Sequence, residues 1–153
     1  MKTKEFEKCI ERGKIKIFPK AKQLVFKELD LAKEDLKTAR DSFKNKNYKW
    51  STIQSYYSMF HTARALIYQK SYREKSHFCL MEALKSLYIS EHLLDSKFLE
   101  ALQLGKALRE NADYYGDFDK PGTESMLASA KDFLKESKKI LGRKIINQKG
   151  LRL

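Results

Sequence analysis

Polar and aromatic side chains that could bind an anion recur along the segment 50–69. Tyr57, His61 and Arg64 are separated by four and then three residues, so they share one face of a helix. A guanidinium group forms paired hydrogen bonds with phosphate oxygens, and a tyrosine ring stacks on a base or donates a hydrogen bond. This face is therefore a candidate wall of an anion-binding cleft. The alternative is that His61 is a structural histidine, satisfied by a hydrogen bond at the edge of a helical bundle.

Two further groups of residues could complete such a cleft. Arg109 and Asp113 are four residues apart and are followed by Tyr114. On a helix the charged pair is either an exposed ion pair worth about 0.3–0.5 kcal/mol or part of the site. Lys75 and His77 lie in a loop and at the start of a short predicted helix, where the N-terminus favours anions. The alternative is a loop that is only solvated.

Other kinds of site have no support in the sequence. It contains no HExxH motif, no paired cysteines, no glycine-rich phosphate loop and no nucleophile elbow, so we predict neither a metal nor a cofactor. Cys9 and Cys79 are far apart in the sequence, and we expect two buried thiols in a reducing cytosol. The N-terminus lacks the apolar region of a secretory signal, and no apolar run approaches the roughly 20 residues that span a membrane. We expect a soluble, cytoplasmic protein with no membrane partner.

The charge balance is strongly basic. The chain has 32 basic and 20 acidic residues, which gives a net charge of +12. This excess favours a polyanionic partner such as RNA, or it serves only solubility. The C-terminal residues 143–153 include Arg143, Lys144, Lys149 and Arg152 and no acidic residue. This tail could touch a phosphate backbone or could be a solvated end.

Hydrophobic periodicity predicts four long helices. Apolar residues recur at spacings of three and four in each of them. In the first two helices the expected core residues are Val25, Leu29, Ala32, Leu36, Ala39 and Phe43, and then Ile53, Tyr56, Phe60, Ala63 and Ile67. In the last two they are Phe98, Ala101, Leu104, Leu108, Ala112 and Tyr115, and then Leu127, Ala130, Leu134 and Leu141.

Cap and turn residues predict where the helices begin and end. Pro19 is expected in the first turn of the first long helix, and Ser51 is a plausible N-cap of the second, which covers about 50–69. A shorter helix is expected over 77–89. The segment 14–18 alternates polar and apolar residues but is short and ends at Pro19, so it is interpreted as a linker.

The last two helices have similar signals. Asp95 and Ser96 can cap the third, which runs to about Tyr115. Thr123 or Gly122 caps the fourth, and Gly142 is expected at its C-terminus. The predicted fold class is all-α, an up-and-down four-helix bundle with a short extra helix between the second and third long helices. The expected organisation is a short helix and linker over 1–18, the bundle over 19–142 and the basic tail over 143–153.

Three linked motifs resemble those of HEPN domain proteins. Residues 56–66, YYSMFHTARAL, resemble the "YYAMFHAARALL" helix of that family. Lys75-Ser76-His77 resembles the K-T-H that follows it, and residues 109–114, RENADY, resemble R-x-x-A-D-Y on a later helix. The resemblance covers roughly residues 20–141, and its order and spacing are similar to those of the small stand-alone prokaryotic branch.

The resemblance implies several properties of the chain. It implies the helical-bundle fold of the family, a homodimer, and a minimal nucleotidyltransferase as the partner in a toxin–antitoxin pair. Several HEPN proteins are metal-independent ribonucleases with an R-x4–6-H motif, in which the imidazole exchanges a proton during attack of the RNA 2′-hydroxyl. Others bind nucleotides or only mediate assembly.

The sequence departs from the ribonuclease pattern. No histidine follows Arg109, and Tyr114 stands at the first position where one would be expected. Tyrosine has a reference pKa of about 10 and is a poor base near neutrality. We therefore expect a nucleotide-, RNA- or partner-binding module rather than an enzyme. Its expected site residues are Tyr57, His61, Arg64, Lys75, His77, Arg109, Asp113 and Tyr114. The alternative is a ribonuclease toxin with a displaced histidine, in which Arg109 and His61 are catalytic.

Overall fold

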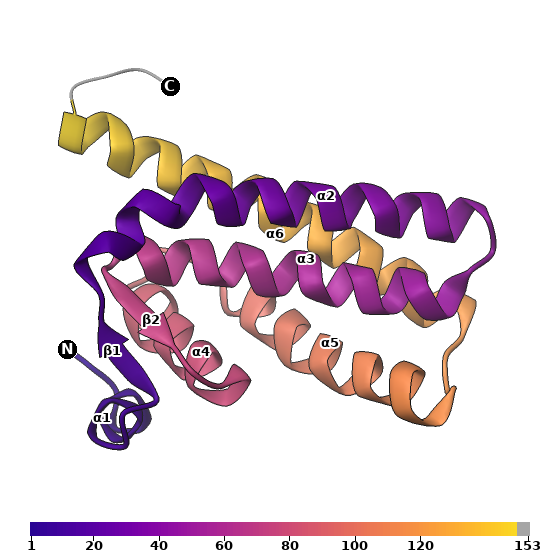
Figure 1. Ribbon diagram of the computed structural model, residues 1–153, viewed down its shortest axis with the longest axis horizontal. Coiled ribbons are helices and arrows are strands. Elements are labelled where there is room, and N and C mark those ends of the chain that lie inside the picture. Colours follow the sequence, from indigo (N-terminus) through magenta and orange to yellow (C-terminus); the bar gives the residue numbers. More distant parts are fainter. Residues whose placement is uncertain (150–153) are drawn as a thin grey trace.

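Four long helices form the body of the protein in the part of the chain that the structure describes (Figure 1). The computed structural model describes residues 1–149, with side chains described as far as Gly142. The long helices are α2 (Val25–Lys44), α3 (Tyr48–Gln69), α5 (Ser96–Tyr115) and α6 (Lys120–Lys149). Helix α3 contacts each of the other three. The predicted all-α bundle is confirmed.

The helix α3 packs against α2 partly through serine hydroxyls. Ser51 Oγ donates to the carbonyl of Ala39 at 2.7 Å, and Ser58 Oγ donates to the carbonyl of Ala32 at 2.8 Å. The prediction that Ser51 caps this helix is therefore wrong. The helix begins at Tyr48, after Asn47, and Ser51 is a buried residue of the helix that satisfies its hydroxyl across the helix pair.

A small antiparallel sheet lies at one end of the bundle (Figure 1). Strand β1 (Ile15–Ile17) pairs with β2 (Tyr72–Glu74), with Ile15 opposite Glu74 and Ile17 opposite Tyr72. The interpretation of the segment 14–18 as a linker is therefore wrong. Three residues are a weak strand signal alone, and the hydrogen-bonding partner of β1 is far along the chain.

Shorter helices surround this sheet. Helix α1 (Lys4–Glu11) precedes β1, and the 3-10 helix η1 (Pro19–Leu24) leads into α2. The helix expected to begin near Pro19 thus starts as a 3-10 turn. Helix α4 (His77–Leu84) follows β2 and continues as the π-helical turn η2 (Lys85–Ile89), which together match the predicted helix over 77–89.

A disulfide joins helix α1 to helix α4. Cys9 and Cys79 are bonded, with their Cα atoms 5.8 Å apart. The expectation of two free thiols is wrong, because folding brings the two distant segments together. Phe6, on the same helix as Cys9, is fully buried in the main core. The disulfide thus connects two segments that also share hydrophobic packing.

Helix α5 turns a different face inward from the one predicted. Leu104 and Tyr115 were expected in the core, but they are 56% and 79% exposed. The buried line runs instead through Phe98, Leu102, Gly105 and Ala112. Gly105 has no apolar side chain and was not recognised as a core position. A Cβ atom there would lie 2.8 Å from Met59 Cε and 3.3 Å from Tyr56 Cδ1, so glycine allows α5 to approach α3 closely.

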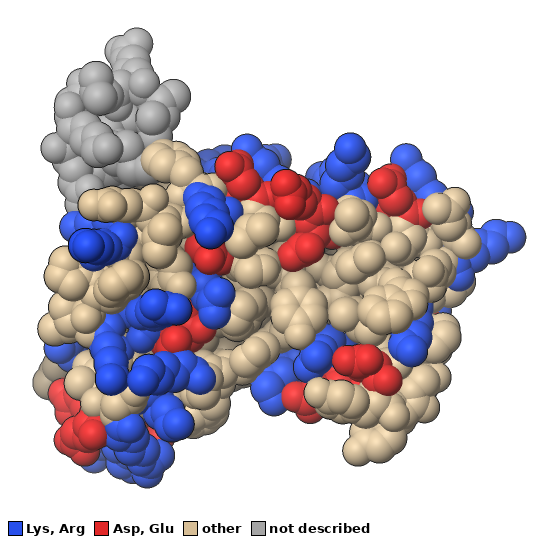
Figure 2. Space-filling view, in the orientation of Figure 1, with Lys and Arg blue, Asp and Glu red and all other residues tan. Residues whose placement is uncertain are grey.

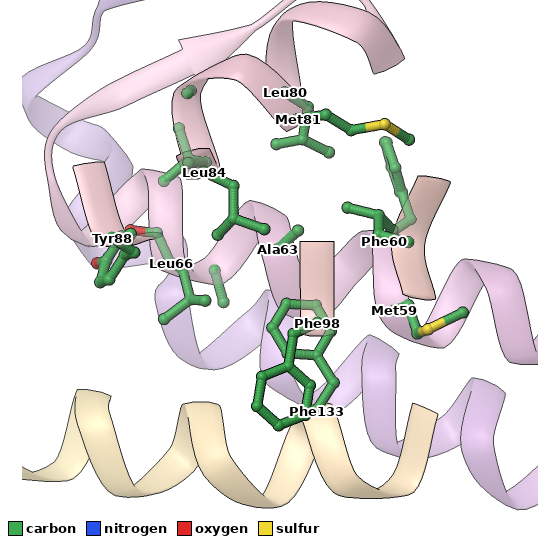
Figure 3. Close-up of a cluster of buried hydrophobic side chains, with 14 of the residues drawn as sticks. Met59, Phe60, Ala63, Leu66, Leu80, Met81, Leu84, Tyr88, Phe98 and Phe133 are labelled. Atoms are coloured by element: carbon green, nitrogen blue, oxygen red, sulfur yellow. The ribbon is translucent and has the colours of Figure 1, made fainter. Parts of the chain in front are cut away.

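The centre of the core lies between α3, α4, α5 and α6. Phe98 of α5 stacks on Phe133 of α6 with ring centroids 5.4 Å apart. Figure 3 shows this pair beneath Ala63 and Leu66 of α3, with Leu80, Met81 and Leu84 of α4 on the other side. The core residues predicted for α3 are all buried: Ile53, Tyr56, Phe60, Ala63 and Ile67.

Helix α6 is longer than expected. It begins at Lys120 and passes through Gly142 to Lys149, so the prediction that Gly142 ends it is wrong. Of its expected core residues, Ala130, Leu134 and Leu141 are buried and Leu127 is partly buried. The basic side chains predicted to form a tail over 143–153 lie outside the described residues.

Charged side chains cover much of the surface unevenly. On the face shown in Figure 2, basic and acidic residues alternate along the upper edge, where α2 lies, while Lys and Arg gather where β1 and β2 lie. Among the residues that the structure describes, no helix has the length and apolar character needed to cross a membrane.

Candidate functional site

Arg109 lies on the inward-facing line of helix α5, one turn after Gly105. Its side chain is 17% exposed. The guanidinium carbon lies 5.4 Å from the ring centroid of Tyr57 and 5.5 Å from that of Tyr114. Burial of an arginine between two aromatic rings removes it from water and keeps its charge close to the ring faces.

The hydrogen bonds of Arg109 are incomplete. Nη2 donates to Asp113 Oδ2 at 3.3 Å, which confirms that these two side chains meet one helical turn apart. Nε is buried and has no hydrogen-bond partner among the described residues. A buried N–H group without an acceptor costs about 1–3 kcal/mol. Such a group is unusual in a native structure, and an acceptor from a ligand or a water molecule is one way to satisfy it.

His77 is the histidine that the fold brings near Arg109. It is the first residue of α4, after the N-cap Ser76, whose hydroxyl accepts from Cys79 N. The phenolic oxygen of Tyr56 lies 2.6 Å from His77 Nδ1, and the imidazole stacks on Phe60 with centroids 4.7 Å apart. The ring is therefore held in one orientation by a polar contact at its edge and an apolar contact on its face.

The electrostatic surroundings of His77 favour the neutral imidazole. Burial lowers the pKa of His77, and the positive charges of Lys106 and Arg109 lower it further. Burial also raises the pKa of the Tyr56 hydroxyl, which therefore keeps its proton near neutrality. A neutral imidazole paired with a protonated phenol can accept or pass on a proton.

Lys106 and Glu110 extend the same face of α5. Lys106 Nζ donates to Glu110 Oε1 at 2.6 Å. The pKa of Glu110 is lowered chiefly by this hydrogen bond and also by the positive charges of Lys106 and Arg109. We define the Arg109 cluster as the residues that gather here: Tyr56, Tyr57, His77, Lys106, Arg109, Glu110, Asp113 and Tyr114.

His61 and Arg64 lie on the same helix as Tyr57 but make their polar contacts elsewhere. His61 Nδ1 lies 2.6 Å from Glu28 Oε2, and His61 Nε2 lies 3.7 Å from Asp35 Oδ2. Both carboxylates belong to α2. In the described part of the chain, no contact joins His61 to Arg109. This placement matches the alternative of a structural histidine held by hydrogen bonds.

Arg64 is held by carboxylates in a similar way. Its Nε and Nη2 donate to the two oxygens of Glu74 on β2, at 3.1 and 2.8 Å. Its Nη1 lies 3.8 Å from Glu28, and its guanidinium carbon lies 4.6 Å from the ring centroid of Phe60. We define the Glu28 cluster as Glu28, Asp35, His61, Arg64 and Glu74.

The eight site residues expected from the sequence are thus divided by the fold. All eight were expected around one cleft, and five of them gather in the Arg109 cluster: Tyr57, His77, Arg109, Asp113 and Tyr114. His61 and Arg64 share the face of α3 that carries Tyr57, but further along the helix, where they belong to the Glu28 cluster. Lys75 is exposed at the end of β2. Phe60 lies between the two clusters, since its ring contacts both His77 and Arg64.

Several polar members of these clusters were not recognised in the sequence. Glu28 is 6% exposed and lies three residues after Val25 and four before Ala32, so a carboxylate on an apolar face was a detectable signal. Lys106 precedes Arg109 by one helical turn and could have been found by the same spacing. The role of the Tyr56 hydroxyl could not have been found from the sequence, because its contact with His77 depends on how α4 packs.

No group of residues that could hold a metal ion is present in the part of the chain that the structure describes. The functional groups of the Arg109 cluster are cations, phenols and one imidazole, with two carboxylates already bound by Lys106 and Arg109. Such a set is suited to an anionic ligand with an aromatic part, or to proton transfer at a phosphate ester.

Comparisons with known proteins agree with the fold. The sequence model of the HEPN domain matches residues 27–145. A protein of Methanocaldococcus jannaschii named "Putative toxin MJ0605" is 29% identical over 116 residues, which cover 74% of this chain and 85% of that protein. A second, "Putative toxin MJ0142" of the same organism, is 26% identical over 117 residues, covering 75% of this chain and 80% of its own. Because the matched segment covers more than half of the chain and includes most of each of the four long helices, we conclude that the chain belongs to the HEPN domain family.

Proposed function

We propose that this HEPN chain is a toxin-like protein that binds the phosphate groups of a nucleotide or of RNA at the Arg109 cluster. The observation that carries the proposal is the Arg109 side chain, which is 17% exposed and whose buried Nε lacks a hydrogen-bond partner among the described residues. A phosphate oxygen would supply the missing acceptor and a charge of the opposite sign. The two matched relatives, which are named as toxins, support the toxin-like part of the proposal.

The neighbours of Arg109 fit the rest of a nucleotide. Tyr114 is 66% exposed and Tyr57 is partly exposed, so each offers ring surface on which a base can stack. Asp113 occupies Nη2 and keeps the guanidinium between the two rings. Lys106 adds a second cation one turn away on α5. Phosphate and base would therefore be recognised by different members of one cluster.

The test compares two arginines that differ in burial. Arg109→Gln removes the buried cation, and Arg40→Gln removes an exposed one from α2 with the same loss of net charge. Binding of a fluorescent ATP analogue and of a labelled single-stranded RNA is measured for both. Since a hydrogen bond to a charged group contributes about 1.5–3 kcal/mol, we expect Arg109→Gln to weaken binding by roughly ten- to a hundredfold. Equal affinities of the two folded variants for both ligands would contradict the proposal.

The second candidate function is that of a metal-independent ribonuclease. The observation that favours it is the position of the His77 imidazole. The imidazole is near Arg109, contacts the Tyr56 hydroxyl and has a lowered pKa. Such a ring can act as a general base near neutrality. In this candidate His77, rather than His61, exchanges the proton, and Arg109 stabilises the charge that develops on the phosphate.

Incubation of the protein with structured RNA in EDTA tests this second candidate. His77→Ala and Arg109→Ala are expected to abolish cleavage, and His61→Ala is expected to retain it in proportion to the folded fraction. Loss of cleavage in His61→Ala at full folding would assign the base to His61 instead. Cleavage that survives all three substitutions would indicate a contaminating nuclease.

We propose two partners from the resemblance, a second copy of the chain and a small nucleotidyltransferase. Exposed aromatic residues near the end of α5 support self-association, since Tyr115 and Phe118 are 79% and 44% exposed and large aromatic residues are enriched in interfaces. Sedimentation over a range of concentrations tests the homodimer, and a monomer at all of them would contradict it. Co-purification with the product of a neighbouring nucleotidyltransferase gene tests the second partner.

A further inference from the structure

The outer face of the β1–β2 sheet carries four basic side chains in two cross-strand pairs. The register places Lys16 opposite Arg73. Two residues further along, the backbone N–H of Lys75 donates to the carbonyl of Lys14 at 2.8 Å, which places these two lysines opposite each other. All four side chains are exposed. We define the sheet patch as Lys14, Lys16, Arg73 and Lys75, and Figure 2 shows basic side chains gathered over this part of the molecule.

Like charges on directly opposed residues destabilise an antiparallel strand pair. The pKa of Lys75 is lowered, chiefly by the neighbouring ammonium group of Lys16, with further repulsion from Lys14 and Arg73. Among the described residues, no carboxylate forms an ion pair with any of the four. The protein therefore maintains a patch of uncompensated positive charge on its shortest elements.

The side chain of the acidic residue Glu74 lies on the face of the sheet opposite the four basic side chains. Glu74 lies between Arg73 and Lys75 in the sequence, but its side chain is on the inner face and is bound by Arg64. Ile15, its cross-strand partner, is also buried. The alternation of a β-strand thus places Ile15 and Glu74 inward and the four basic residues outward. The charges of the outer face are therefore available to a partner from outside the sheet.

An open groove beside the patch adds apolar surface to the charge. It has a volume of about 550 Å³ and is lined by Lys16, Ile17, Phe18, Arg73, Glu74 and Lys75. Ile17 is 73% exposed, and the Arg73 guanidinium lies over the ring of Phe18 at 5.5 Å. Cations that can follow a phosphate backbone, next to apolar and aromatic surface that can contact bases, are the combination that binds single-stranded nucleic acids.

We infer that the sheet patch and its groove bind the backbone of single-stranded RNA. The surface is separate from the Arg109 cluster, since none of its residues contacts Arg109. It is nonetheless continuous with that cluster along the chain, because β2 ends at Glu74 and His77 begins α4. Strand β1 also precedes the segment matched by the HEPN sequence model.

The test removes the four charges and compares the result with a matched control. The patch variant is Lys14→Gln/Lys16→Gln/Arg73→Gln/Lys75→Gln. The control variant removes four exposed charges from α2 in the same way: Lys33→Gln, Lys37→Gln, Arg40→Gln and Lys44→Gln. Both variants have the same net charge, so a difference between them reports position rather than total charge. Loss of mutual repulsion is expected to leave the patch variant folded.

Binding of a labelled oligouridylate is measured over a range of salt concentrations. Each phosphate contact to a single strand contributes about −0.7 to the slope of log K against log salt. We expect the patch variant to lose a slope of about 3 and to bind at least about tenfold more weakly at low salt, whereas the control keeps most of the wild-type affinity. Equal slopes and affinities of the two variants would overturn the inference.

Two further binding measurements distinguish a failure of this inference from a failure of the function proposed for Arg109. The patch variant is expected to bind the ATP analogue as the wild type does, whereas Arg109→Gln is expected to lose it. If Arg109→Gln keeps its affinity for both the ATP analogue and the oligouridylate while the patch variant loses the oligouridylate, the proposed function fails and the inference stands. Binding of polyglutamate by the patch without binding of oligouridylate would assign the surface to an acidic protein and would overturn the inference.

Discussion

The phenolic oxygen of Tyr56 lies 2.6 Å from Nδ1 of His77. These residues belong to α3 and α4, and their contact connects the centre of the bundle to the Arg109 cluster. Tyr56 is fully buried, so its ring position is set by core packing. The orientation of the imidazole is therefore determined by the core, and packing changes around Tyr56 are expected to reach the candidate site.

The first prediction concerns the pH dependence of folding. Because burial lowers the pKa of His77 in the folded state, the unfolded chain, with an ordinary pKa of about 6.5, binds more protons at mildly acidic pH. Stability is therefore expected to fall as the pH drops below about 6.5, with a slope of at most about 1.4 kcal/mol per pH unit from this group.

Urea unfolding of the wild type and of His77→Gln between pH 7.5 and 5.5 measures this effect. The variant is expected to show a flatter dependence, and the difference between the two curves isolates His77 from other groups. An NMR titration of the His77 ring in the folded protein gives its pKa directly. A midpoint above that of a free imidazole would contradict the prediction.

The second prediction concerns the close approach of α5 at Gly105. In Gly105→Ala the added methyl group would meet Met59 Cε at 2.8 Å and Tyr56 Cδ1 at 3.3 Å, and an overpacked core typically loses about 1–3 kcal/mol. Gly142→Ala is the matched control, because its added methyl group has nothing within 4 Å and alanine favours a helix by about 1 kcal/mol.

The unfolding free energies of the two variants test whether a methyl group at position 105 destabilises the protein. We expect Gly142→Ala to be as stable as the wild type or more so, and Gly105→Ala to be less stable than Gly142→Ala. A chemical-shift change of His77 in Gly105→Ala would show that the packing change reaches the site through Tyr56. Equal stabilities would mean that the flexible ends of Met59 and Met126 move aside without cost.

The third prediction separates the Glu28 cluster from ligand binding. Glu28 is nearly buried and contacts both His61 and Arg64. Glu28→Gln removes the carboxylate charge that both side chains contact, and breaking a buried pair costs about 3–5 kcal/mol. Because His61 and Arg64 are partly exposed to solvent, we expect a smaller loss, about 2 kcal/mol. Asp30→Asn, an exposed carboxylate on the same helix, is expected to change stability little.

A double-mutant cycle with His61→Ala provides the check on this pair. The two losses are expected to be less than additive, since each substitution removes the same contact. Folded Glu28→Gln is also expected to bind the ATP analogue with unchanged affinity. A large loss of affinity at full folding would place the Glu28 cluster in the binding site.

The fourth prediction concerns the disulfide between Cys9 and Cys79. It closes a loop with a sequence separation of 70 residues, and the chain-entropy model gives a contribution of about 4 kcal/mol for a loop of this length. Urea unfolding with and without dithiothreitol is expected to show a stability loss of this order. Cys9→Ser/Cys79→Ser should match the reduced wild type, and dithiothreitol should not affect it further. Identical curves for oxidised and reduced wild type would rule out the stabilising role.

The sequence by itself determined the helices and the family. Helical periodicity and caps are local properties, since they depend on residues three or four apart. They correctly placed the end and the core line of α3 and the capping residue Asp95 of α5, but not the start of α3. The three HEPN motifs are also local strings. Five of the expected site residues gather around Arg109, although the inward face of α5 was recognised only in part.

Only the tertiary structure decided which polar groups meet. The pairing of β1 with β2, the disulfide, and the contact of His77 with Tyr56 each join segments far apart in the sequence, and no local pattern specifies such contacts. His61 contacts Glu28 on another helix rather than Arg109, and no local pattern identifies that partner. The burial of Arg109 depends on Gly105, whose missing side chain lets α5 approach α3. Helical periodicity is read from apolar residues alone. It therefore cannot detect a core position such as Gly105, where no side chain fits.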